Sequence, residues 1–210
     1  MSVLRIDPVT CTPESLAPAA DWLRAGGIVA FPTDTFYGLA VDPVSAVAVK
    51  ELFDLKGRPP SAALPLIAAS KPQVENFCGP LSATTSRLAW RFWPGPLSLI
   101  FDAPEVVVPE VRGGGRTIAI RVPAHRGARA LCEAFGAPIT ATSANRRGEP
   151  AVVSADALDQ LAADERVLVI DGGTTAGGAA STIVDARGPR PVLVRDGAIA
   201  WNRVLELLKE

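Results

Sequence analysis

The sequence predicts an α/β protein in which helices flank a twisted, mixed β-sheet, and three observations support this prediction. Short apolar segments alternate with longer amphipathic segments along the whole chain. The chain has 210 residues, 48% of them hydrophobic, so a single domain of this size can bury about 70% of its unfolded surface. No internal repeat and no linker rich in proline, serine or charge divides the sequence, so we expect one domain over residues 1–210.

The first third of the chain should fold as helix, strand and helix. Thr12 followed by Pro13 is typical of a helix start, and Gly26 with Gly27 should end that helix. A buried strand is expected at 28–31, because Pro32 lacks the N–H group that a sheet ladder requires. Ser45 should then cap a second helix, which carries apolar residues at helical spacing.

The remaining two thirds repeat this alternation. Strands are expected at 64–68, 97–101, 117–122, 138–142, 167–170 and 192–195. Helices are expected at 82–92, at 127–135, from residue 154 and at 201–209. A glycine-rich loop over 171–180 leads into the apolar segment STIVDA. Such a loop can bind phosphate through its backbone amides, although it lacks the GK[ST] ending of a P-loop.

Composition argues against several classes of chemistry. Cys11, Cys78 and Cys132 are scattered, so they predict neither a disulfide framework nor a zinc site. His125 is the one histidine in the sequence, and we interpret it as a surface or helix-capping residue and not as a catalytic base. The net charge is −1, which gives no overall attraction to nucleic acid.

Hydropathy gives an expectation about location. No apolar run approaches the roughly 20 residues needed to span a bilayer. The N-terminal residues lack the charged and then apolar layout of a signal peptide. We therefore expect a cytoplasmic protein that does not contact membranes.

Polar side chains collect where the predicted strands end. Thr33, Asp34 and Thr35 follow the strand at 28–31, and KGRP places Lys56 and Arg58 in a loop after the next helix. Open α/β sheets bind their ligands at such strand ends. Lysine and arginine in a short glycine-containing loop are typical of a phosphate clamp.

Two further strand ends carry the same kinds of group. Thr117, Ala119 and Arg121 share one face of the strand at 117–122, since side chains alternate along a strand. The strand at 138–142 runs into Ser143-Ala144-Asn145. Cations and hydroxyls without a carboxylate pair suit anionic ligands that react through orientation and charge neutralisation. We therefore predict an enzyme acting on a nucleotide and a small polar co-substrate.

Seven strings connect this sequence to a known family. They are FPTDTFYGLA, KGRP, FWPGPLSLIF, IAIRVPAH, PITATSAN, DGG and STIVD, in that order. In this order they resemble the strings of the YrdC/Sua5 family, the threonylcarbamoyl-AMP synthases, over roughly residues 20–197. The chain looks like the short form of that family, which implies a single YrdC-like domain with a concave basic groove.

The resemblance implies a reaction, its substrates and its partners. Members of this family convert L-threonine, bicarbonate or CO₂, and ATP with Mg²⁺ into L-threonylcarbamoyl-adenylate and pyrophosphate. The product feeds the t6A modification of tRNA at position 37, so transient contact with other proteins of t6A synthesis is expected. Such a reaction requires the protein to position the substrates and to neutralise the phosphates with cationic side chains. The resemblance implies no metal ligand from the protein.

The resemblance also implies roles for individual residues. The threonine contacts fall on Thr35, Arg121, Ala141 and Ser181. The ATP contacts fall on Lys56, Arg58, Thr117, Ser143, Asn145 and Arg195, with Lys56 and Arg58 as the catalytic cations.

Three positions depart from the family pattern. Ala141 replaces a serine or threonine often found there, which removes one hydroxyl contact to threonine. Ile67 replaces the histidine common in longer members, although short forms also tend to lack it. The segment 146–148 reads Arg-Arg-Gly where Leu-Ser-Gly is usual, which affects the loop expected beside ATP.

Two alternative functions remain. One is a weakly RNA-binding or ribosome-maturation module that uses the same basic groove, suggested by the arginines between 112 and 129 and at 146 and 147. The other is a carbamoyl-adenylate domain like those of hydrogenase-maturation proteins, which usually lie in longer chains with zinc-finger-like cysteines.

Overall fold

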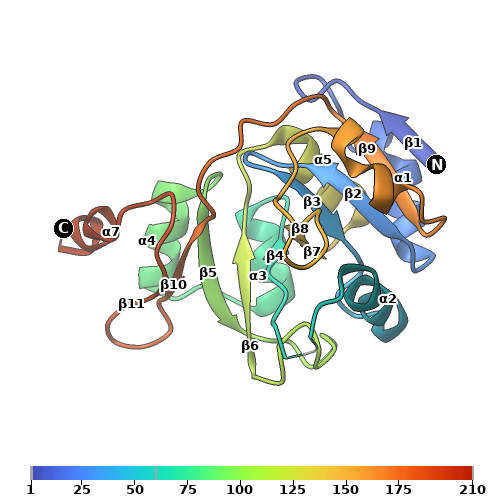
Figure 1. Ribbon diagram of the computed structural model, residues 1–210. Coiled ribbons are helices and arrows are strands. Elements are labelled where there is room, and N and C mark those ends of the chain that lie inside the picture. Colours follow the sequence, from blue (N-terminus) through green and yellow to red (C-terminus); the bar gives the residue numbers. More distant parts are fainter. Residues whose placement is uncertain (1, 60, 210) are drawn as a thin grey trace.

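The strands of this protein form two mixed sheets with helices packed around them (Figure 1). A computed structural model describes residues 2–59 and 61–209. The predicted α/β class with mixed strands is confirmed, but the strands divide between two sheets where the sequence predicted one. The single-domain organisation over residues 1–210 stays a prediction.

The first sheet has five strands in the order β1-β9-β2-β3-β8. Strands β1, β9 and β2 are parallel, β3 returns antiparallel to β2 as a hairpin, and β8 pairs antiparallel with β3. Their bounds are β1 Ser2–Arg5, β2 Ile28–Pro32, β3 Tyr37–Ala40, β8 Thr142–Ser143 and β9 Val167–Asp171.

The second sheet has six strands in the order β11-β10-β5-β6-β4-β7. β10 is parallel to β5 and β4 is parallel to β6, whereas the other neighbours are antiparallel. Their bounds are β4 Leu66–Ile67, β5 Leu97–Asp102, β6 Thr117–Arg121, β7 Ile139–Thr140, β10 Thr182–Asp185 and β11 Val192–Arg195.

Several helices begin at a residue whose side chain accepts a hydrogen bond from the first turn, which stabilises the helix start. Ser45, Ser70, Ser82 and His125 serve in this way, so the predicted capping roles of Ser45 and His125 are confirmed. The α-helices are α1 Ala17–Arg24, α2 Ala46–Lys56, α3 Lys71–Cys78, α4 Ala83–Phe92, α5 Arg126–Phe135, α6 Asp159–Ala162 and α7 Trp201–Lys209. Two 3₁₀ turns precede α1 and α6, at Glu14–Leu16 and Ala155–Leu158.

Strand β2 is buried on both faces, which explains its continuous apolar run. Ile28 and Ala30 belong to the larger core, which includes residues of α2 and α4. Val29 and Phe31 belong to a second core, which α1 and α5 cover. The hairpin turn at 33–36 therefore follows a strand that is packed against a core on each face.

The expected strand at 138–142 is interrupted at Ala141. Residues 139–140 pair in the second sheet and residues 142–143 pair in the first, so the chain passes between the sheets at this point. The amide of Ala141 donates to the carbonyl oxygen of Pro65 at 2.8 Å. Pro65 itself has no N–H, and β4 begins directly after it, with two residues where five were expected.

Three elements were not predicted from the sequence, β1, β3 and α3, and β10 was expected only as the apolar segment STIVDA. β3 follows the polar hairpin turn directly, so the sequence pattern did not distinguish its four residues from that turn. Within residues 2–59 and 61–209, we found no helix with the length and apolarity needed to cross a membrane.

Candidate active site

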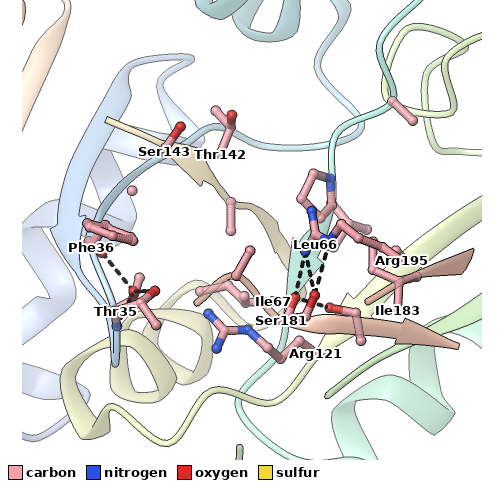
Figure 2. Close-up of a pocket in the computed structure, with 18 of the residues that line it drawn as sticks. Thr35, Phe36, Leu66, Ile67, Arg121, Thr142, Ser143, Ser181, Ile183 and Arg195 are labelled. Atoms are coloured by element: carbon pink, nitrogen blue, oxygen red, sulfur yellow. Dashed lines mark hydrogen bonds between the residues drawn. The ribbon is translucent and has the colours of Figure 1, made fainter. Parts of the chain in front are cut away.

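A pocket of about 380 Å³ lies between the two sheets. The first sheet contributes the hairpin turn and β8, and the second sheet contributes residues of β4, β5, β6, β10 and β11. Seven of the ten residues predicted for the site line this pocket: Thr35, Arg58, Arg121, Ala141, Ser143, Ser181 and Arg195. Sequence positions as far apart as 35 and 195 therefore meet in one hollow, with Thr35 facing Arg121 across it (Figure 2).

The hairpin turn presents Thr35 to the pocket through a local hydrogen-bond arrangement. The Thr33 hydroxyl donates to the carbonyl oxygen of Phe36 at 2.7 Å and accepts from the amide of Thr35 at 3.2 Å. Thr33 thus stabilises the turn, which is typical of threonine. The one hydroxyl proton of Thr33 is thereby used. The Thr35 hydroxyl is therefore the donor in the 3.3 Å contact between the two hydroxyls, or it donates to a ligand instead.

Arg121 forms an ion pair with Asp34 at the edge of the pocket. Its Nη1 atom lies 2.9 Å from Oδ1 and 2.8 Å from Oδ2 of Asp34. The two side chains are only 11% and 16% exposed, so solvent screens the pair weakly. The predicted sharing of one strand face by Thr117, Ala119 and Arg121 is confirmed, because these three alternate with the buried Ile118 and Ile120.

Arg195 is held against β10 by Ser181. Its guanidinium donates to the carbonyl oxygen of Ser181 from Nε and Nη2, at 3.0 and 2.8 Å, and to Oγ at 3.0 Å (Figure 2). Ser181 Oγ in turn contacts Ser98 Oγ at 2.9 Å. Burial, and then the nearby charge of Arg121, lower the pKa of Arg195, but an arginine so placed stays protonated.

Arg58 enters the pocket because the chain reverses after α2. Gly57 has a φ of 61°, the left-handed conformation that glycine adopts readily at a helix end. Arg58 then donates to the carbonyl oxygens of Ala62 and Ala63, at 3.2 and 2.7 Å, and to Oγ1 of Thr142 at 3.3 Å. Burial lowers the pKa of Arg58, and its charge is fixed in one orientation.

Lys56 does not line the pocket but fastens the loop that follows β8. Its side chain is 5% exposed, and its ammonium donates to the backbone carbonyl oxygens of Ser143 and Asn145 and to Oδ1 of Asn145. All three N–H groups are thereby used. Burial, together with the charge of Arg58, lowers the pKa of Lys56 to about 8.

Asn145 and Thr117 also lie outside the pocket lining. Asn145 accepts from Lys56 and from the Ser143 hydroxyl, and its own amide donates to the carbonyl oxygen of Glu149. Thr117 begins β6, four residues before Arg121 on the same face. The structure therefore places Asn145 as a support for Ser143, and Thr117 further along the strand that carries Arg121.

The glycine-rich loop after β9 crosses over the hairpin turn. The amide of Gly177 donates to the carbonyl oxygen of Thr35 at 2.7 Å, and the amide of Thr175 donates to that of Val153. Gly177 has a φ of 69°, which favours glycine there. The loop delivers Ala180 and Ser181 to the pocket, so it connects the two sheets at the site.

Sequence reasoning missed three residues of this site. Ser98 is 2% exposed within an apolar strand, and a polar residue in such a strand was the one signal of its role. Thr142 positions Arg58, and Asp34 pairs with Arg121. Asp34 stood out as part of the polar turn, but no pattern in the sequence indicated its partner.

The described residues contain no group of three or more His, Cys, Asp or Glu side chains that could hold a metal ion. Cys11, Cys78 and Cys132 are free thiols, and burial raises the pKa of each. The pocket lining supplies three arginines and no carboxylate. Such a surface suits anionic ligands.

Comparison with known proteins gives a consistent family assignment. The family model Sua5/YciO/YrdC, described as telomere recombination, matches residues 21–197. The threonylcarbamoyl-AMP synthase of Pyrococcus abyssi is 39% identical over 192 residues, which are 91% of this chain and 56% of that protein. The threonylcarbamoyl-AMP synthase of Bacillus subtilis is 37% identical over 199 residues, which are 94% of this chain and 58% of that protein.

A solved structure agrees with these matches. The crystal structure of P. abyssi Sua5 complexed with L-threonine superposes with a TM-score of 0.89 at 36% identity. The match covers 99% of this chain and 61% of that one. This chain therefore spans somewhat more than half the length of these relatives.

Proposed function

Because the chain belongs to the Sua5/YciO/YrdC family, we propose that it is a threonylcarbamoyl-AMP synthase. In the proposed reaction, L-threonine, bicarbonate or CO₂, and ATP give L-threonylcarbamoyl-adenylate and pyrophosphate, a nucleotidyl transfer. The product would serve t6A synthesis at position 37 of tRNA, where transient contact with other t6A proteins is expected.

One observation carries this proposal: the arginines that line a single pocket have chemically different partners. Arg121 is already paired with Asp34, beside the hydroxyl of Thr35. Arg58 and Arg195, which we assign to the other substrate, donate to carbonyl and hydroxyl oxygens and have no carboxylate partner among the described residues. An amino acid, with charges of both signs, suits the first arrangement, and a triphosphate suits the second.

The threonine end supplies groups for each part of the substrate. Arg121 would bind the carboxylate, since Nε and Nη2 make no hydrogen bond within residues 2–59 and 61–209. Thr35 and Ser181 would contact the polar groups of threonine. Ala141 and Ile67 provide an apolar wall for its methyl group.

The nucleotide end would bind ATP through charge and backbone positioning. Arg58 and Arg195 would neutralise the phosphates, and the Ser143 hydroxyl, which donates to Asn145 Oδ1 in this structure, would turn to donate to the nucleotide. We assign Lys56 and Asn145 to positioning the loop after β8, with Thr117 at the margin. Mg²⁺ would arrive bound to the ATP phosphates, where it would reduce the negative charge of the triphosphate.

In this proposal the protein acts by alignment. The threonine ammonium group first loses one proton to solvent; the free amine then attacks CO₂ and loses a second proton to solvent, which gives a carbamate that keeps one N–H. A carbamate oxygen then attacks the α-phosphorus of ATP, and the bond to the leaving pyrophosphate breaks. The fixed guanidinium groups of Arg58 and Arg195 would stabilise the negative charge that develops on the phosphates, without a covalent intermediate on the protein.

A direct assay tests the proposal. Purified protein incubated with ATP, L-threonine and bicarbonate should release pyrophosphate in a threonine-dependent manner, and mass spectrometry should detect threonylcarbamoyl-adenylate. The Arg58→Ala variant should lose this activity, whereas Arg190→Ala, at an exposed position between β10 and β11, should keep it. Pyrophosphate release that is absent or independent of threonine would reject the proposal.

A further inference from the structure

Asp34 offsets the charge of Arg121, a feature that the other two arginines of the pocket lining do not share. Both of its carboxylate oxygens contact Nη1 of Arg121. Among the described residues, neither Arg58 nor Arg195 lies within 4.0 Å of a carboxylate. Arg121 and Asp34 together therefore carry one positive and one negative charge, whereas Arg58 and Arg195 carry two positive charges that no carboxylate of the described residues offsets.

The ion pair leaves one edge of Arg121 open to a ligand. Asp34 uses only Nη1, and no other contact to Nε or Nη2 is found in the part of the chain that the structure describes. A carboxylate ligand can accept two hydrogen bonds from that edge, which matches its geometry. A ligand bound there lies close to the negative charge of Asp34.

We propose that Asp34 makes this end of the pocket select molecules that carry an ammonium group beside a carboxylate. This inference rests on the proposed function and adds a recognition residue to it. A ligand with a carboxylate alone is repelled by Asp34, because screening is weak at a site this buried. In an amino acid the ammonium group offsets that repulsion, and Asp34 attracts it directly.

The same charge arrangement separates the two substrates. A triphosphate has several negative charges and no ammonium group, so Asp34 disfavours its binding at the Arg121 end. The two positive charges of Arg58 and Arg195, which line the same pocket, favour triphosphate binding beside them. Asp34 would thereby contribute repulsion against the wrong ligand as well as attraction for the right one.

Two ligands that differ only in the amino group test this inference. (R)-3-Hydroxybutyrate keeps the carboxylate, hydroxyl and methyl groups of L-threonine and lacks the amine. Calorimetric titration should be performed with both ligands on the wild type, on Asp34→Asn and on Asp34→Glu. Asp21→Asn is the matched control, since it removes a carboxylate charge from an exposed position on α1.

The ratio of the two dissociation constants is the diagnostic quantity. In the wild type and in Asp21→Asn, threonine should bind at least about tenfold more tightly than 3-hydroxybutyrate, as expected for one favourable charge contact. Asp34→Asn should reduce that ratio to within about threefold, mainly by weakening threonine binding. Asp34→Glu keeps the charge and should retain most of the discrimination.

A role limited to holding Arg121 in place gives a different result. Asp34→Asn would then weaken both ligands equally and leave the ratio unchanged, which would overturn the inference. Circular dichroism of each variant separates this outcome from misfolding, and Asp34→Ser provides a second neutral variant. If the wild type makes threonylcarbamoyl-adenylate while Asp34→Asn keeps the wild-type ratio, only this inference fails. If the ratio falls as expected but no adenylate forms, only the proposed function fails.

Discussion

The ammonium group of Lys56 lies 2.6 Å from the backbone carbonyl oxygen of Asn145 and 3.3 Å from its side-chain oxygen. The backbone repeats this connection, because the amide of Arg147 donates to the carbonyl oxygen of Lys56 at 3.0 Å. The last residue of α2 thus holds the loop after β8, and Arg58, two residues later, lines the pocket. Residues 56–58 therefore contribute both to the lining of the proposed nucleotide site and to the contacts that hold its loop in place.

Replacing Lys56 by Met should weaken ATP binding without removing any group from the pocket. The three carbonyl oxygens would lose a charged donor, so the segment carrying Ser143 would become less well ordered. We expect the dissociation constant for ATP to rise by about tenfold, as for the loss of one hydrogen bond to a charged group, and that for threonine to change little. Calorimetric titration measures both. Lys50→Met is the matched control, because Lys50 is an exposed lysine on the same helix.

The same lysine predicts how ATP binding depends on pH. Burial lowers the pKa of Lys56 to about 8, so the fraction of the ammonium form falls from about nine tenths at pH 7 to about one tenth at pH 9. ATP affinity should decrease over this interval, since the neutral amine donates fewer hydrogen bonds. Titrations from pH 7 to pH 9.5 check this. Lys56→Met should have lost the dependence, and an equal slope in both proteins would contradict the assignment.

Arg58 and Arg121 should affect different substrates. Arg58→Ala removes charge from the end assigned to phosphate and should weaken ATP binding by about 10- to 100-fold, with a smaller effect on threonine. Arg121→Ala should show the reverse pattern. Binding of each ligand to each variant gives a two-by-two comparison. Equal losses for both ligands in Arg58→Ala would show that the two ends are not separate.

The sequence predicted the elements that periodicity or a cap defines, and missed those that depend on distant partners. The helix beginning after Ser45 and the strand at 28–31 were expected, because local patterns specify them. The change of sheet within the expected strand at 138–142 was not, since it occurs at Ala141, whose amide bonds to Pro65. Nothing in the five residues 138–142 distinguishes a continuous strand from one that changes sheets.

The site shows the same division between local and long-range information. Arginine and hydroxyl residues at strand ends indicated anionic ligands, and most of the predicted residues do line one pocket. The role of Lys56 could not be inferred, because a lysine beside Arg58 reads as a second phosphate contact and its carbonyl partners lie 87 and 89 positions away. Likewise, the Asp34–Arg121 pair joins residues 87 positions apart.

The hydroxyl of Tyr37 should stabilise the protein through the DGG segment. Tyr37 is fully buried, and its hydroxyl donates to the carbonyl oxygen of Gly173 at 2.7 Å and accepts from the amide of Gly172 at 3.3 Å. Tyr37→Phe would leave these backbone groups without a partner. We expect the free energy of unfolding to fall by about 1–3 kcal/mol, measured by urea denaturation. An unchanged denaturation midpoint would mean that the hydroxyl makes no net contribution.

Ser181 and Arg195 should act as a unit in ATP binding. Arg195 donates to both oxygens of Ser181, and Ser98 contacts the Ser181 hydroxyl from the neighbouring strand. Removing either the serine hydroxyl or the guanidinium breaks the same contact, so their effects should not add. In a double-mutant cycle of Ser181→Ala and Arg195→Ala, we expect a coupling energy of about 0.5–3 kcal/mol for ATP affinity. Pairing Arg195→Ala with Ser154→Ala, a serine outside the pocket lining, should give additive effects. Additivity in the Ser181 cycle as well would show that the serine does not orient the guanidinium.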